Sequence, residues 1–442
     1  MALVKDWQDI CKLDFSIDRT DGPVLDSPLK HTAFMDDEEG VAYYTRRSTV
    51  DEIHGAGMEV PYFEAAGPRS HIRHDPAWTR AAIVTCGGLC PGLNDVVKAL
   101  VNTLWLGYGV TNIFGIRYGY RGLVTSSGLD PIELNPDVVD TIHENGGSIL
   151  GTSRGEQDTE EIVRTLHRRN INVLFTIGGD GTLRAAREIS ECAQKWDLPI
   201  SVIGVPKTID NDVGFLERTF GFETAIYAAS PVISCAHDEA KAVENGIGLV
   251  RLMGRDSGFL AAYASLANSV VNMCLIPEVP FALEGKRGLL SAVRKRLAIK
   301  DHMVIVAAEG AGQDLMEGKE VRDASGNIVK KDIGIFLRQA IGADLDKHGI
   351  EHSIKYFDPS YMVRSVPARG TDAVFCLHLA ENAVHAAMSG RTNMVVGHWQ
   401  GQFTHVPIAL ATRERRVIDP NGQIWQSVQA VTRQERYWDG DA

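Results

Sequence analysis

The sequence predicts an α/β protein built from two Rossmann-like parallel-sheet domains of helix-covered strands. The first supporting observation is an alternation of short, β-branched apolar runs with longer segments whose apolar residues recur every three or four positions. Buried strands that alternate with amphipathic helices are typical of parallel sheets covered by helices. The second observation is the length of 442 residues, which two sheets accommodate better than one very wide sheet.

The individual elements follow from these runs. We expect the strands of the first sheet at 80–86, 112–117, 173–178 and 200–206. A helix is expected over 95–109, where six apolar residues share one face: Val96, Val97, Leu100, Val101, Leu104 and Trp105. The second sheet is expected from strands at 246–253, 271–278, 303–310 and 353–357, with helices at 289–300 and 333–347.

These elements suggest a division of the chain. We expect an N-terminal extension over 1–78, a first α/β domain over 79–222 plus about 371–410, a second over 223–370, and a C-terminal tail over 411–442. The extension has turn signals and mixed charge without sustained periodicity. We therefore expect it to pack on the core or on a neighbouring subunit.

Composition excludes several classes of function. The 45 Lys and Arg residues against 57 Asp and Glu give a net charge of −12, which argues against non-specific binding of nucleic acid or anionic membranes. No apolar run reaches the roughly 20 residues that span a bilayer, and the N-terminus lacks a secretory pattern. The seven scattered cysteines are typical of reduced thiols, so we expect a cytoplasmic protein. Cys86 and Cys90 lack the further ligands of a zinc site.

Glycine-rich turns follow two of the expected strands, at the sheet edge where ligands of α/β proteins bind. The first, "CGGLCPGLND" (86–95), contains Gly88, and its Asn94 is positioned to cap the next helix. Its amide groups suit an anion, although a tight strand-to-helix turn would also need these glycines. "GYRGL" and "LGTSRGEQD" add Tyr120 and Arg154, which suit stacking on a base or pairing with a phosphate.

The second turn, "GGDGT" (178–182), encloses one carboxylate between glycines. Gly179 and Gly181 allow a phosphate to approach the backbone, and Asp180 can hold the magnesium ion that neutralises it. An acid placed directly after a buried strand has little structural purpose without a cation. The turn is not a Walker A sequence, because no Gly-Lys-Ser or Gly-Lys-Thr follows.

A third strand end, "VPKTIDNDVG" (205–214), is the most specific. In extended backbone Asp210 and Asp212 would point to the same side. One carboxylate can accept a proton from a substrate hydroxyl, and the second can shape charge around the transferred group. Lys207 supplies positive charge where negative charge accumulates. The alternative is an Asx-type turn capped by its own aspartates.

Together, "GGDGT", "PKTIDND", "GFETA", "MGRDSGF" and "DPSYMVR" resemble the phosphofructokinase family in order and spacing. Within that family, "TCGGLCPGLNDVV", "GIGLVRLMGRDSG" and "PSYMVR" are most similar to the ATP-dependent branch of trypanosomatids and plants. The resemblance implies transfer of a phosphoryl group to the 1-hydroxyl of fructose 6-phosphate, with Mg²⁺ as cofactor.

The resemblance also implies a role for each matched residue. Asp210 would be the base, assisted by Thr208, Asp212, Lys207 and Arg255. The nucleotide would be bound by Gly88, Tyr120, Arg154, Gly179, Asp180, Gly181 and Thr182, with Asp180 on the metal. The sugar phosphate would be bound by Thr208, Asp210, Met253, Gly254, Arg255, Glu309, Tyr361 and Arg364, of which Arg364 and Tyr361 would grip the 6-phosphate.

Two positions that distinguish phosphoryl donors in this family give opposite indications here. Members that use pyrophosphate typically carry aspartate after "GGD" and lysine before "TIDND", whereas typical bacterial ATP enzymes carry glycine at both. This chain has Gly181 and Lys207. We favour ATP, because an aspartate at 181 would repel the α-phosphate and glycine leaves the space open. Pyrophosphate is the alternative.

The sequence leaves the activity and the assembly of the chain partly open. The same fold could bind a sugar phosphate without turnover, or act on another substrate such as sedoheptulose 7-phosphate. The resemblance favours a homotetramer, with the extension and the tail "RQERYWDGDA" at subunit contacts. The allosteric effector is left open.

Overall fold

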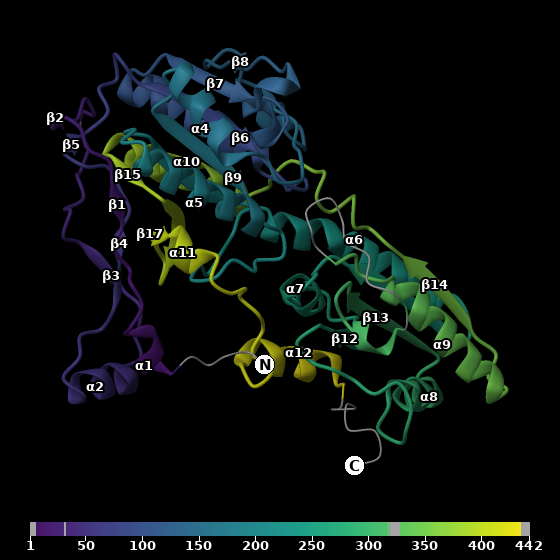
Figure 1. Cartoon of the computed structure of the whole chain (residues 1–442). Coiled ribbons are helices and arrows are strands. Elements are labelled where there is room, and N and C mark those ends of the chain that lie inside the picture. Colours follow the sequence, from purple (N-terminus) through teal and green to yellow (C-terminus); the bar gives the residue numbers. More distant parts are fainter. Residues whose placement is uncertain (1–5, 31, 317, 319–327, 435–442) are drawn as a thin grey trace.

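The computed structural model describes residues 6–30, 32–316, 318 and 328–434. The fold class is confirmed, because its two large sheets are built mainly from parallel strands covered by helices. Figure 1 shows them as two lobes, with helix α6 (Phe222–Lys241) running from one to the other. The last residues of the expected tail, 435–442, lie outside the described residues.

The first sheet has nine strands in the order β3-β4-β17-β16-β10-β9-β6-β7-β8. Its parallel centre consists of β16, β10, β9, β6 and β7, and antiparallel strands flank it on both sides. The strands are β3 (Gly40–Ala42), β4 (Tyr62–Ala65), β6 (Arg80–Thr85), β7 (Asn112–Ile116), β8 (Ile132–Glu133), β9 (Val173–Gly178), β10 (Ser201–Pro206), β16 (Met394–Trp399) and β17 (Gln402–Pro407).

The pairing register of β6, β9 and β10 aligns the ends of these strands, from which the predicted turns begin. β9 and β10 are buried along their whole length, as expected for apolar runs in a parallel sheet. They pair in parallel so that Gly178 lies opposite Pro206, and β6 pairs on the other side of β9 with Thr85 opposite Ile177. The turns that follow these strands therefore leave the sheet side by side. The helices packed on this sheet are α3 (Leu93–Asn102), α4 (Thr159–Arg168), α5 (Asp180–Lys195), α10 (Thr371–Met388) and α11 (Ile408–Ala411).

The second sheet has four parallel strands in the order β12-β13-β11-β14. They are β11 (Gly246–Leu252), β12 (Met273–Leu275), β13 (His302–Ala308) and β14 (Ser353–Phe357). Helix α6 covers this sheet together with α7 (Phe259–Ala267), α8 (Leu289–Ile299) and α9 (Ile333–Lys347). Every strand expected from the sequence is present, although the run 271–278 is a strand only over its centre.

The described segments nearest the two termini pack on these sheets. Strand β4, from the expected extension, pairs with β17 and brings β3 with it, so this segment packs on the core of its own chain. Two small antiparallel sheets are formed by β1 (Asp18–Arg19) with β15 (Arg391–Thr392) and by β2 (Leu25–Asp26) with β5 (His71–Ile72). The helices of this region are α1 (Trp7–Ile10) and α2 (Arg47–Gly55). In Figure 1 these purple elements lie along the outer edge of the first lobe.

The C-terminal part returns to the second sheet. Helix α12 (Gln423–Thr432) packs against α7, and the side chain of Gln434 accepts the backbone N–H of Cys274 at 2.7 Å. The described part of the expected tail is therefore folded against the second lobe. Among the helices described, none combines the length and apolarity needed to cross a membrane.

Candidate active site

A cleft of about 600 Å³ opens at the carboxyl ends of β6, β9 and β10 and extends to the loop after β11. Most of the predicted site residues line it: Gly88, Tyr120, Arg154, Gly179, Asp180, Gly181, Thr182, Lys207, Thr208, Asp210, Asp212, Met253, Arg255 and Arg364. Three do not line it, namely Gly254, Glu309 and Tyr361. Residues from separate parts of the sequence thus converge on one cavity.

Positive charge gathers around the first glycine turn. Lys207 is buried and donates from Nζ to the carbonyl oxygen of Gly88 at 2.6 Å. A Cβ on Gly88 would lie 3.2 Å from Nη1 of Arg364 and 3.4 Å from Nη2 of Arg154, so both guanidinium groups approach the same turn. Burial lowers the pKa of Lys207. Three cationic side chains in this space suit a polyanionic ligand.

Asn94 does not cap helix α3, so that expectation is wrong. Gly92, with φ +93°, occupies the cap position, where a Cβ would meet Sγ of Cys376 at 2.5 Å. The side chain of Asn94 instead donates to the carbonyls of Ile142 and Asn145 at 2.9 and 3.0 Å. It therefore fastens a distant loop beside the turn, because a buried amide is best satisfied by several backbone partners.

The second turn leaves open space for a ligand. Asp180 is the first residue of α5, and its carboxylate is 3.1 Å from Nε of Arg184. A Cβ at Gly181 would meet nothing within 4 Å. Tyr120 is only 7% exposed, and its hydroxyl donates to the carbonyl of Thr182 at 2.9 Å. Tyr120 therefore supports the turn from beneath, with little of its ring open to a nucleotide base.

The donor set at Asp180 suits a magnesium ion that arrives with phosphates. In the described part of the chain, no group of three or more His, Cys, Asp or Glu side chains is placed to hold a metal on its own. Mg²⁺ is commonly bound through one or two carboxylates together with the phosphates of a substrate. The Asp180 carboxylate at the start of α5 fits that arrangement, with Arg184 as its partner in the structure.

The third turn is compact, and the expectation that extended backbone aligns Asp210 with Asp212 is wrong. Asn211 between them has φ +52°, in the left-handed region, so the backbone is not extended at this position. The hydroxyl of Thr208 accepts the backbone N–H of Asp210 at 3.0 Å and donates to Oδ1 of Asp212 at 3.0 Å. Both aspartates still line the cleft. The turn geometry, and not strand alternation, brings them to one cavity.

The two aspartates have different surroundings. Both oxygens of Asp212 are occupied, Oδ1 by Thr208 and Oδ2 by the guanidinium of Arg415 at 2.9 Å. Oδ1 of Asp210 is buried, and among the described residues it has no hydrogen-bond partner. Burial, Asp212 and Glu309 raise the pKa of Asp210 well above its usual value. Asp210 is therefore the carboxyl group of the pair that is poised to take up a proton.

The loops of the second sheet form the opposite wall. Met253 and Arg255 follow β11, and Gly254 between them has φ +129°, where a Cβ would lie 2.6 Å from the carbonyl oxygen of Ser257. The hydroxyl of Ser257 donates to the backbone carbonyl of Asp210 at 3.0 Å. This contact ties the loop after β11 directly to the turn that carries the aspartates.

The remaining predicted sugar-side residues lie beside the cleft. Glu309 follows β13 and pairs with Arg251 at 3.0 Å, and burial raises its pKa. The guanidinium of Arg364 lies over the ring of Tyr361, 4.6 Å from its centroid, while Tyr361 is 74% exposed. Arg364 lies on the side of the cleft that holds Gly88, because a Cβ on Gly88 would be 3.2 Å from its Nη1.

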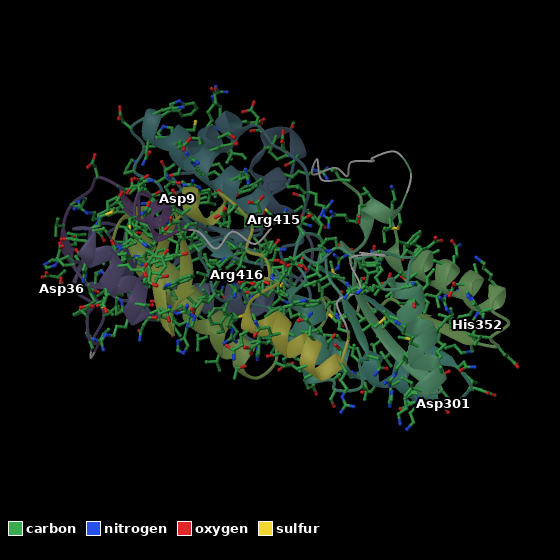
Figure 2. All side chains as sticks on the ribbon, turned by 90° about the horizontal axis from the view of Figure 1, so that it is seen from below. Asp9, Asp36, Asp301, His352, Arg415 and Arg416 are labelled. Atoms are coloured by element: carbon green, nitrogen blue, oxygen red, sulfur yellow. The ribbon has the colours of Figure 1, made fainter. Side chains whose placement is uncertain are left out.

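Sequence reasoning missed Arg415. Its Nη1 lies 2.9 Å from Oδ2 of Asp212 and 2.9 Å from Oδ2 of Asp256. Figure 2 shows Arg415 and Arg416 near the middle of the molecule, between the end that carries Asp36 and the end that carries His352. The available signal was the basic run "RERR" (413–416), which the sequence pattern alone places in the tail.

Comparisons with known proteins agree with this geometry. A family model described as "Phosphofructokinase" matches residues 80–387. The chain is 50% identical to an ATP-dependent 6-phosphofructokinase of Amycolatopsis methanolica over 85% of this chain and 83% of that protein. It is 42% identical to the corresponding protein of Trypanosoma brucei brucei, over 95% and 87% of the two chains. Its fold is similar to a solved pyrophosphate-dependent phosphofructokinase from Marinobacter aquaeolei, with a TM-score of 0.66, 19% identity and coverage of 82% and 94%.

Proposed function

The chain belongs to the phosphofructokinase family, and from that premise we propose that it transfers the γ-phosphoryl group of ATP to the 1-hydroxyl of fructose 6-phosphate. The products are ADP and fructose 1,6-bisphosphate, as in glycolysis. The observation that carries the proposal is the unpartnered Oδ1 of Asp210, which is buried beside a cleft lined by cationic side chains. Curated relatives that carry the name ATP-dependent 6-phosphofructokinase support the choice of donor and acceptor.

Proton transfer is assigned to Asp210. Its Oδ1 accepts the proton of the 1-hydroxyl as the oxygen attacks the γ-phosphorus and the bond to the β-phosphate oxygen breaks. Thr208 holds the turn through its two hydrogen bonds, and Asp212 stays ionised beside Arg415. Lys207 and Arg255 supply positive charge to the transferred group.

The nucleotide is assigned to the first two turns. Gly179, Gly181 and Thr182 lie at the start of α5, where backbone N–H groups and the helix dipole favour phosphate. Gly88, Tyr120 and Arg154 form the adjoining wall. Asp180 would hold Mg²⁺, and the ion would neutralise charge on the phosphates. In the structure its carboxylate pairs with Arg184.

The sugar phosphate is assigned to the loops of the second sheet. Met253, Gly254 and Arg255 contact the sugar and the transferred group, and Glu309 binds a sugar hydroxyl. Arg364 and Tyr361 hold the 6-phosphate. In the structure Glu309 pairs with Arg251, and Arg364 lies over the ring of Tyr361 and close to Gly88.

The domain organisation and the assembly of the chain are assigned in the same way. Residues 79–222 with about 371–410 form the nucleotide-binding domain, and residues 223–370 form the sugar-phosphate domain. The extension over 1–78 and the segment 411–442 complete the chain. We assign a homotetramer in the cytoplasm, in keeping with the family.

Pyrophosphate is the second candidate donor, and Lys207 is the observation that favours it, because a buried ammonium group suits a compact polyanion. The test measures formation of fructose 1,6-bisphosphate from fructose 6-phosphate and Mg²⁺, with ATP or pyrophosphate in parallel. We expect turnover with ATP and less than about 1% of that rate with pyrophosphate. A faster rate with pyrophosphate would show that Lys207 outweighs Gly181. The same assay with sedoheptulose 7-phosphate in place of fructose 6-phosphate tests the other acceptor. Tight binding of a sugar phosphate without turnover with either donor would indicate a non-catalytic protein that senses the sugar phosphate.

A further inference from the structure

Residues 411–418, the crossing segment, run from the first lobe to the second along the turn that carries the aspartates. The carbonyl of Ala411 accepts the N–H of Gly214 at 3.2 Å, and the N–H of Arg416 donates to the carbonyl of Asp212 at 2.9 Å. Farther along, the N–H of Ile418 donates to the carboxylate of Glu278 at 2.9 Å. The same segment is therefore hydrogen-bonded to the aspartate turn and to the second sheet.

Arg415 points from this segment into the cleft. One nitrogen, Nη1, lies 2.9 Å from Asp212 on the first-sheet side and 2.9 Å from Asp256 in the loop after β11. Asp256 has a second partner, because its Oδ1 is 3.2 Å from Nζ of Lys330. The chain Asp212–Arg415–Asp256 thus joins the two walls of the cleft through side-chain charge.

Arg416 next to it has a different position. Its Nη1 donates to the carbonyl of Glu217 at 2.7 Å, and its guanidinium lies over the ring of Phe259 at 4.5 Å from the centroid. Arg416 anchors the crossing segment to both lobes outside the cleft. This anchoring leaves Arg415 directed at the carboxylates.

We propose that Arg415 is a positioning residue for phosphoryl transfer, which holds the carboxylate of Asp212 and fixes the spacing between the aspartate turn and the loop after β11. The inference rests on the proposed function. By engaging Asp212, Arg415 leaves Asp210 as the carboxyl group available to the substrate hydroxyl. By engaging Asp256, it holds the loop that carries Arg255 at the distance at which donor and acceptor meet.

The electrostatics agree with this geometry. Burial raises the pKa of Asp212, and the positive charge of the Arg415 guanidinium is the strongest of the effects that lower it. Arg415 also lowers the pKa of Asp210, although burial, Asp212 and Glu309 outweigh it. Removal of this positive charge should raise the pKa of both groups, so that the base is protonated over a wider range of acidic pH.

The experiment compares three variants with the wild type. Arg415→Met removes the charge and keeps much of the side-chain volume, Arg415→Lys restores the charge without the planar fork, and Arg413→Met is the matched control on the same segment with an exposed side chain. We expect kcat of R415M to fall about 100-fold, with KM for both substrates changed less than about threefold. R415K should recover part of the loss, and R413M should match the wild type.

The pH profile provides a readout that a merely structural role would not move. We expect the acidic limb of the kcat profile of R415M to shift upward by about one pH unit. Asp256→Asn removes the charge at one end of the bridge, together with the ion pair of Asp256 with Lys330, and keeps the pair of Arg415 with Asp212. A kcat loss of about fivefold or more in D256N supports the bridge, and the double variant R415M/D256N should be no slower than R415M alone.

The outcomes separate the two proposals. A wild type that makes no fructose 1,6-bisphosphate overturns the proposed function and this inference with it. A fully active wild type whose R415M variant has unchanged kcat and an unmoved pH profile overturns the inference alone. If R415M does not fold, as judged by its thermal unfolding against R413M, D256N decides, and an unchanged kcat in that variant counts against the bridge.

Discussion

Two clusters in this molecule bury carboxylates among arginines, and their acids behave in opposite ways. The Glu64 cluster consists of Asp37, Glu64, Arg69, Arg391 and His405, at the junction of the N-terminal strands with β15 and β17. Burial alone would raise the pKa of Glu64, but a hydrogen bond from His405 and the hydrogen bond and charge of Arg391 hold it well below its usual value. In the cleft, by contrast, the pKa of Asp210 is raised by burial and by neighbouring carboxylates.

Burial raises the pKa of both carboxyl groups, and their hydrogen-bond partners and neighbouring charges set the opposite outcomes. Oε1 of Glu64 accepts from Nδ1 of His405 at 2.8 Å and from Nη2 of Arg69 at 3.4 Å, and it also bonds to Nε of Arg391. Oδ1 of Asp210 has no hydrogen-bond partner among the described residues. A buried carboxylate with every oxygen bonded holds a structure together, whereas one that keeps an unbonded oxygen beside like charge can exchange a proton.

The contrast is tested most strongly by Asp210→Asn. The amide keeps the shape of the carboxyl group but cannot accept the proton, so we expect kcat to fall about 1,000-fold or more. The KM for fructose 6-phosphate should change far less, because the loss is confined to the transition state. Stability should stay level or rise, since a buried carboxyl with raised pKa is replaced by a neutral group. Turnover near the wild-type rate would contradict the assignment of Asp210 as base.

The counterpart is Glu64→Gln in the Glu64 cluster. It leaves two buried guanidinium groups without their central carboxylate, so we expect the free energy of unfolding to fall by about 3 kcal/mol. Chemical denaturation measures this loss, and kcat per folded molecule should be unchanged. Glu160→Gln, which disrupts an exposed pair with Arg164, should cost less than about 1 kcal/mol. A large loss of kcat in the folded E64Q protein would mean that the two clusters are coupled.

Gly181→Asp adds a carboxylate to the cleft. A Cβ at this position meets nothing within 4 Å, so the substitution acts through charge and through the volume of the carboxylate itself. We expect kcat/KM for ATP to fall about 30-fold through repulsion of the nucleotide phosphates, with a smaller effect on pyrophosphate. Gly181→Ala is the matched control for the Cβ alone and should stay near the wild type. Equal losses in both variants would show that space, and not charge, limits the donor.

The sequence predicted the sheet core of this fold and most of the cleft, because strands such as 173–178 and their glycine turns are encoded by neighbouring residues. It did not predict the Glu64 cluster, whose bond from His405 to Glu64 spans 341 positions. Nor did it predict the roles of Asn94 and Arg415. Their local patterns fit a helix cap and a charged tail, and only the fold reveals their distant partners. Long-range polar contacts are selected by three-dimensional proximity, which a local pattern does not contain.

The smallest expected effect concerns histidines buried outside the cleft. Nε2 of His74 lies 2.9 Å from the hydroxyl of Ser201, and burial lowers the pKa of His74 to about 4. The unfolded chain has an ordinary histidine pKa of about 6.5, so it binds this proton as the pH falls below that value while the folded state does not. The stabilisation from neutral His74 is therefore complete above about pH 6.5 and is lost progressively toward pH 4.

His74→Gln isolates this contribution, because the amide nitrogen of glutamine can replace Nε2 without titrating. The free energy of unfolding of the wild type should fall more than that of H74Q between pH 7.5 and 5.5, by about 1 kcal/mol. Denaturation of both proteins at the two pH values measures the difference. Unlike protonation of Asp210, protonation of His74 should destabilise the fold on acidification without any change in the cleft. Parallel pH dependences would show that His74 is protonated in the folded state, against its hydrogen bond to Ser201 in apolar surroundings.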